Sequence, residues 1–140
     1  MEDFICRENG SSISCSFSST LANVDRAVDA SRNFLHSRHI PFNPFELIFV
    51  LREALNNAVI HGNKKDSSLK VVCSLYLDQD TLTITVTDQG KGFDWQRQML
   101  KAPVSSHTTS GRGLNSMEGF GFSMRFNEAG NTLYLTKKII

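Results

Sequence analysis

Residues 44–63 read PFELIFVLREALNNAVIHGN, and this stretch predicts a long helix with two chemically different faces. Proline suits the first turn of a helix and glycine suits its end, so we expect the helix to run from about Pro44 to His61, closed by Gly62. The apolar side chains that recur at helical spacing should pack on a sheet, and they are Leu47, Leu51, Ala54, Leu55 and Ala58.

A polar stripe lies beside the apolar face of this predicted helix. Glu53, Asn57 and His61 follow one another four residues apart and therefore share one side of the helix. A carboxylate and an amide oxygen one turn apart can ligate Mg²⁺ and orient a hydroxyl, because Mg²⁺ prefers oxygen ligands and keeps several waters. Taken alone, the stripe also fits a solvated helix face, and His61 also fits a cation that complements the helix dipole.

A first glycine turn, DQGKG at 88–92, follows a predicted strand at 82–87. The carboxylate of Asp88 can accept a hydrogen bond from an amine such as that of adenine. Gly90 and Gly92 let the backbone bend and let a flat ring approach without a Cβ in the way. The motif is weak by itself, because Asp and Gly are ordinary turn residues.

A second glycine turn, SGRGL at 110–114, opens a predicted short helix. Backbone N–H groups at a glycine-rich helix start can bind an anion, so Gly111 and Gly113 are candidates for phosphate contacts. Between the two turns, residues 101–110 are rich in Ser and Thr and predict a loop. The P-loop pattern and the Rossmann glycine pattern are both absent from the sequence.

The rest of the chain alternates apolar and polar residues, as antiparallel strands do. We expect further strands at 13–17, 69–77, 121–127 and 132–138, and a first helix capped by the hydroxyls at 18–20 and ending near residue 38. Residues 1–12 are polar and expected to be flexible, which leaves 13–140 as one domain. Helices grouped between antiparallel strands predict an α+β fold, a two-layer sandwich with helices on one face of the sheet.

The composition excludes several classes of protein. The 140 residues carry a net charge of +1 without a charged run, so no footprint for nucleic acid or an anionic membrane is present. No apolar run approaches a membrane span and the first residues lack the basic region of a signal peptide, so we expect a cytoplasmic protein. Cys6, Cys15 and Cys73 are odd in number without a C-x-x-C pair, which argues against a disulfide framework or a zinc site and for a reducing compartment.

The order of the three motifs is more specific than any one of them. EALNNA at 53–58 with HGN at 61–63, then D-x-G-x-G at 88–92, then G-x-G-L at 111–114 resembles the N, G1 and G2 boxes of the Bergerat-fold (GHKL, histidine-kinase-like) ATPases. Within that superfamily the chain is similar to the anti-sigma-factor serine/threonine kinases of bacterial partner-switching systems. The resemblance runs from about residue 13 to the end and implies a mixed, mostly antiparallel sheet.

The resemblance also implies roles for individual residues. Asn57 should ligate Mg²⁺, Asp88 should receive the adenine amino group of ATP or ADP, and Glu53 should be the general base that takes the proton of the attacking hydroxyl. The other residues that the resemblance brings to the nucleotide are His61, Gly90, Gly92, Gly111, Arg112, Gly113 and Leu114. Arg112 would neutralise phosphate charge, although a surface arginine fits equally well.

The implied function is an anti-sigma factor that also phosphorylates a serine or threonine of an anti-anti-sigma factor. The implied assembly is a homodimer formed through the N-terminal strand and helix, without direct contact to nucleic acid or membrane. The short polar stretch before residue 110 and the EGFG segment at 118–121 depart from many relatives, and they bear on the phosphoryl-transfer step. Two alternatives stay open: a nucleotide-gated binding module without phosphotransfer, and a fragment of a sensor histidine kinase.

Overall fold

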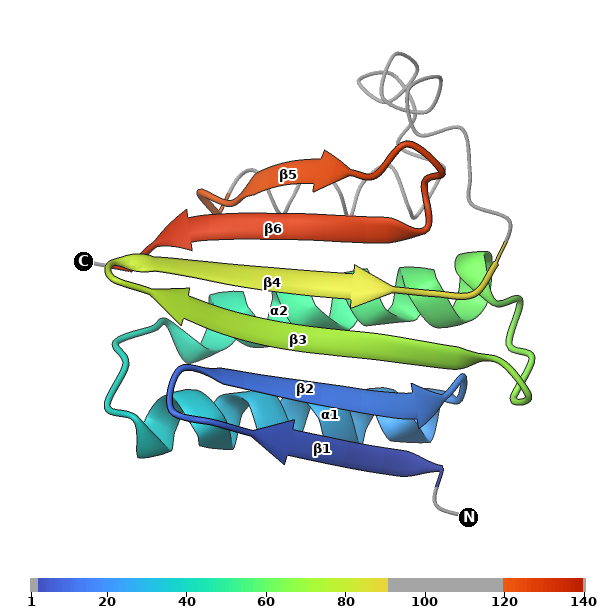
Figure 1. Cartoon of the computed structure of the whole chain (residues 1–140), viewed down its shortest axis with the longest axis horizontal. Helices are drawn as coiled ribbons and strands as arrows, with labels where there is room; N and C mark the ends of the chain where they lie inside the picture. Colours follow the sequence, from blue (N-terminus) through green and yellow to red (C-terminus); the bar gives the residue numbers. More distant parts are fainter. Residues whose placement is uncertain (1–2, 91–119, 140) are drawn as a thin grey trace.

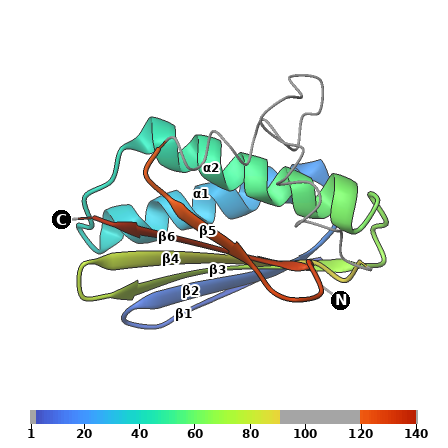
Figure 2. The same ribbon diagram turned by 90° about the horizontal axis from the view of Figure 1, so that it is seen from above.

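The computed structural model describes residues 3–90 and 120–139, which form an α+β sandwich of two layers (Figure 1). Its strands are β1 (Phe4–Glu8), β2 (Ser12–Ser18), β3 (Lys70–Asp78), β4 (Thr81–Thr87), β5 (Ser123–Phe126) and β6 (Thr132–Lys138). Its helices are α1 (Leu21–Ser37), α2 (Pro44–Asn56) and the short η1 (Asn57–Gly62). The strands form one sheet in the order β1-β2-β3-β4-β6-β5, and the helices cover one face of it (Figure 2). The predicted fold class is therefore confirmed.

The starts of both long helices follow from capping residues. The Thr20 hydroxyl accepts a hydrogen bond from the Asn23 N–H at the start of α1. At the start of α2 the Asn43 side chain accepts from the N–H groups of Phe45 and Glu46, and Pro44 occupies the first turn. These contacts satisfy N–H groups that have no partner within the helix. Among the described helices, none is long and apolar enough to span a membrane.

The apolar core lies between the helices and the sheet. On β3 and β4 the side chains that face the helices are buried and alternate with less buried ones, which on β4 are all threonines. The buried strand residues include Val71, Cys73, Leu75, Leu82, Ile84 and Val86. The predicted apolar face of α2 is buried as a whole, from Leu47 to Ala58, which confirms its orientation. β4 lies in the middle of the sheet, paired with β3 on one side and β6 on the other.

The end of α2 differs from the prediction that Gly62 closes the helix. The last turn, η1, is a π-helix: the Asn63 N–H donates to the Ala58 carbonyl five residues back, at 2.8 Å. The chain continues in helical conformation through Gly62 and leaves through Lys64 and Lys65, whose φ angles are 56° and 60°. Gly62 is therefore not a left-handed cap, and the reason for a glycine there lies in its contacts with the site described below.

The N-terminus corrects two further predictions. Residues 4–8 were expected to be flexible, but they form β1, because the Phe4 ring stacks on Phe17 at 5.6 Å and the strand pairs with β2. Cys6 lies opposite Cys15 in this pair, and the two form a disulfide, contrary to the expectation from the cysteine count. Cys73 is the free, buried thiol. All pairings among the described strands are antiparallel, so the mixed sheet is not found in this part of the chain.

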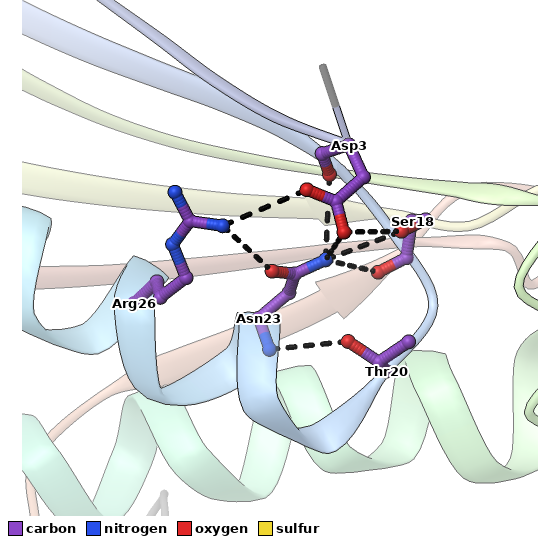
Figure 3. A network of polar contacts seen from close by, with 5 residues as sticks. All are labelled: Asp3, Ser18, Thr20, Asn23 and Arg26. Carbon is purple, nitrogen blue, oxygen red and sulfur yellow. Dashed lines mark hydrogen bonds and ion pairs between the residues drawn. The ribbon is translucent and has the colours of Figure 1, made fainter. Parts of the chain in front are cut away.

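A network of polar contacts ties β1 to the start of α1 (Figure 3). The buried Asn23 amide donates to the carbonyls of Asp3 and Ser18, at 3.3 and 3.0 Å. Arg26 donates to the Asn23 side-chain oxygen at 3.3 Å and pairs with the Asp3 carboxylate at 3.6 Å. The edge strand is thus fixed to the helix layer by hydrogen bonds as well as to its neighbour by the disulfide.

Candidate functional site

Asp88 lies directly after β4, at the same end of the sheet as the end of α2 (Figure 1). Its N–H donates to the Asn131 carbonyl at 2.9 Å, so the backbone here continues the sheet. The Gly90 N–H donates to Oδ1 of the carboxylate at 2.9 Å. Among the described residues, no donor reaches Oδ2, which leaves this oxygen free to accept a hydrogen bond from a ligand. Burial raises the pKa of Asp88, and the Gly90 hydrogen bond partly offsets this.

Two glycines bring the end of η1 against this carboxylate. A Cβ on Gly62 would lie 2.3 Å from Asp88 Oδ2, and a Cβ on Gly90 would lie 2.0 Å from the Gly62 carbonyl oxygen. Neither glycine has a positive φ, so both are required by close approach and not by backbone conformation. Gly90 was predicted to make room for a flat ring; the structure adds that its missing side chain makes room for Gly62.

The polar stripe of α2 continues toward this contact. Glu53 and Asn57 are half-buried and His61 is exposed. Within the described residues, the side chains of all three make no hydrogen bond or ion pair, so their polar atoms are free to bind a ligand. Asn57 begins η1 and Gly62 ends it, so one six-residue segment connects the predicted metal ligand with the Asp88 carboxylate.

Several predicted site residues fall outside the described part of the chain. These are Gly92, Gly111, Arg112, Gly113 and Leu114, together with the predicted loop at 101–110 and the short helix near residue 113. Their predicted roles at the phosphates remain predictions.

Asn63, for which no role was predicted from the sequence, is 1% exposed at the end of η1. It accepts a hydrogen bond from the N–H of Gln89, the neighbour of Asp88. An asparagine directly after a glycine at a predicted helix end was the available signal, but the sequence alone shows neither its burial nor its contacts.

A cavity of about 540 Å³ lies at the opposite end of α2, near its start. None of the predicted site residues lines it, and its Lys137 is already bound to the Glu46 carboxylate at 3.2 Å and the Phe120 carbonyl at 2.8 Å. We therefore place the functional site at the Asp88 end of the sheet.

The described residues fit an adenine nucleotide with Mg²⁺. Asp88 Oδ2 offers an acceptor to an exocyclic amine, and it lies where Gly62 and Gly90 pack closely against the carboxylate and each other. Among the described residues no group of three or more His, Cys, Asp or Glu side chains could hold a metal ion. A metal here would thus rely on Asn57, on phosphate oxygens and on water, which is how Mg²⁺ commonly binds beside nucleotides.

Comparisons with known proteins identify the family of this chain. The profile of a family described as "Histidine kinase-like ATPase domain" matches residues 17–137. An anti-sigma F factor of Oceanobacillus iheyensis is 31% identical over 100 residues, which cover 67% of this chain and 68% of that protein. The anti-sigma F factor of Bacillus subtilis is 32% identical with the same coverage. The anti-sigma F factor of Bacillus thuringiensis is 34% identical over 98 residues, 66% of this chain and 67% of that protein.

Proposed function

We propose, because this chain belongs to the family of histidine kinase-like ATPase domains, that it is an ATP-dependent anti-sigma factor and protein serine/threonine kinase. Membership in an ATPase family implies nucleotide binding. The proposal extends to the kinase step, Mg²⁺ and the protein partners. They are supported by the relatives named anti-sigma F factor and by the side chains of Glu53 and Asn57, which have no hydrogen bond or ion pair among the described residues.

In this mechanism Glu53 on α2, Asn57 at the start of η1 and Asp88 after β4 have separate roles. Asp88 accepts a hydrogen bond from the adenine amino group and fixes the base, while Asn57 supplies an oxygen ligand for Mg²⁺. Mg²⁺, when bound, neutralises negative charge on the phosphates. Glu53 orients the substrate hydroxyl and takes its proton as that oxygen attacks the γ-phosphorus. The bond between the γ-phosphorus and the bridging oxygen breaks, and ADP leaves.

The proposed phosphoacceptor is a serine or threonine of an anti-anti-sigma factor, and the proposed target for sequestration is a sigma factor. We place this action in the cytoplasm, where a sigma factor meets RNA polymerase. A homodimer through β1 and α1 is part of the proposal.

The observation that carries the proposal is the Glu53 carboxylate, which has no partner among the described residues. It lies on the same helix as Asn57, and the last turn of that helix contacts Asp88. The test is transfer of the γ-phosphate from labelled ATP to a candidate anti-anti-sigma factor of the same organism. Glu53→Gln should bind ATP like the wild type but transfer phosphate about 10²- to 10⁴-fold more slowly. Glu128→Gln removes an exposed carboxylate of the β5–β6 turn and should behave as the wild type.

A second function is nucleotide-gated sequestration without phosphotransfer. It needs a bound nucleotide, for which Asp88 Oδ2 is the acceptor, but it needs no general base. Wild-type protein that binds ATP and the sigma factor, yet transfers no phosphate to any partner it releases, would establish this function. Equal transfer rates in the wild type and in Glu53→Gln would instead show that Glu53 is not the base.

A further inference from the structure

Asn63 joins three elements that meet at the nucleotide end of the sheet. Its side-chain amide donates to the Ser19 hydroxyl at 2.6 Å and to the Lys70 carbonyl at 2.9 Å. Its side-chain oxygen accepts from the Gln89 N–H at 2.8 Å, and its own N–H donates to the Ala58 carbonyl within η1. One buried side chain thus connects the end of η1, the β2–α1 junction, the start of β3 and the turn after β4.

The hydrogen bond from the Gln89 N–H to Asn63 restrains the backbone next to Asp88. The backbone of Asp88 is held on one side by its N–H to Asn131, and the next N–H in the chain is held by Asn63. The Gln89 side chain also accepts a hydrogen bond from the Lys70 N–H, so this turn is fixed from two directions. Because Gly62 directly precedes Asn63, the same residue sets how closely η1 approaches the carboxylate.

We propose that Asn63 is a positioning residue for base recognition: it holds the Asp88 carboxylate where it accepts the amino group of adenine and repels the carbonyl of guanine. The proposal rests on the proposed function, because it assumes a purine nucleotide at Asp88. Adenine presents an amino donor at the position where guanine presents a carbonyl acceptor. A carboxylate fixed in place distinguishes the two, whereas a carboxylate free to turn away does not.

A buried asparagine also stabilises the fold, so the test must separate positioning from stability. Ser19→Ala is the matched control: Ser19 is 1% exposed and receives the other hydrogen bond of the Asn63 amide, but it does not contact the Asp88 turn. Asn63→Ala removes the acceptor of the Gln89 N–H as well. Both variants should lower the melting temperature, since each leaves a buried polar group without a partner.

The measured quantity is the ratio of dissociation constants for GTP and ATP, each with MgCl₂. We expect the wild type and Ser19→Ala to prefer ATP over GTP by at least about 100-fold. The Asp88 carboxylate is placed to accept from the adenine amino group, and such a site strongly rejects a base that presents a carbonyl there. In Asn63→Ala this ratio should fall by about tenfold or more, mainly through weaker ATP binding. Asn63→Asp keeps an acceptor for the Gln89 N–H and should keep the ratio within about threefold, even if it melts earlier.

The outcomes separate the two proposals. If the wild type binds neither nucleotide, the proposed function fails. If the wild type prefers ATP and Asn63→Ala keeps the full ratio, Asn63 only stabilises the fold and the present proposal is overturned. Should Asn63→Ala not fold, Asn63→Asp decides: a folded Asn63→Asp that has lost the preference for ATP contradicts the proposal.

Discussion

Replacing Gly62 by alanine should separate nucleotide binding from stability. The added Cβ would lie 2.3, 2.4 and 2.8 Å from the three terminal atoms of Asp88, so the carboxylate has to turn away. Turning breaks the Gly90 N–H hydrogen bond, at a cost of about 1 kcal/mol. Alanine in a helical turn recovers up to about 1 kcal/mol relative to glycine. The two effects nearly cancel, and the ligand-free variant should melt within a few degrees of the wild type.

The effect on binding should be much larger. A displaced Asp88 no longer accepts from the adenine amino group, and a charge-assisted hydrogen bond is worth about 1.5–3 kcal/mol, or about 10- to 100-fold in affinity. Ligand at 100 times its dissociation constant adds about 2.7 kcal/mol of stability. With an unfolding entropy of about 0.3 kcal/mol/K for 140 residues, this raises the melting temperature by about 9 °C. At the same concentration, a 50-fold weaker variant gains only about 2 °C.

Thermal unfolding of the wild type and of Gly62→Ala, with and without ADP, measures both quantities. Gly10→Ala is the control, because a Cβ there would meet no atom within 4 Å and should change neither value. A full ligand-induced shift in Gly62→Ala would refute the reasoning, since it would mean that the Asp88 carboxylate does not hold the base. A large loss of stability without ligand would show that the contact is structural in the first place.

Three further predictions concern charge, the disulfide and a helix start. The pKa of Asp88 is raised in the folded protein, so this group stabilises the ligand-free fold below its unfolded pKa and loses that contribution as the pH rises through its folded pKa. ATP affinity should change in the opposite sense, because the base needs the ionised carboxylate. It should weaken as the pH falls through the folded pKa. Calorimetric titrations between pH 7 and pH 4.5 should show this in the wild type and not in Asp88→Asn. Replacing Cys6 and Cys15 by serine should lower the free energy of unfolding by about 2–3 kcal/mol for a loop of this length, and dithiothreitol should cause the same loss only in the wild type. Identical urea midpoints in the two proteins would exclude the disulfide in solution. Asn43→Ala should lower the melting temperature by about 3 °C through loss of the cap of α2, whereas Asn43→Ser, which keeps an acceptor, should not.

Periodicity and capping chemistry predicted the main elements because they act within a few residues. Leu82, Ile84 and Val86 alternate with threonines, which is the pattern of a strand with one buried face. Thr20 caps the helix that directly follows it. The apolar face of α2 was predicted for the same reason, since helical spacing depends only on the chain itself. The placement of Asp88 at a strand end followed from these local patterns.

The features that the sequence did not reveal depend on partners far along the chain. Residues 4–8 lie within a mostly polar N-terminal stretch, and their order comes from the Phe4 ring on Phe17 and from Asn23, which holds the preceding Asp3. A count of cysteines does not show that residues 6 and 15 face each other, because that depends on the register of β1 against β2. The π-turn at the end of α2 and the tight packing of Gly62 on Asp88 likewise arise from tertiary contacts. Asn63 was overlooked because its four partners are brought together only by folding.

The central position of β4 has a consequence for amide hydrogen exchange. Thr81–Thr87 are paired along their whole length with β3 and with β6, and the Asp88 N–H extends the ladder by one more bond. Such amides exchange chiefly when the entire domain opens, whereas those of the edge strand β1 exchange through local fraying. Nucleotide bound at Asp88 should therefore slow exchange in β4 by a factor that reports its full binding free energy, and should leave the fraying of β1 almost unchanged.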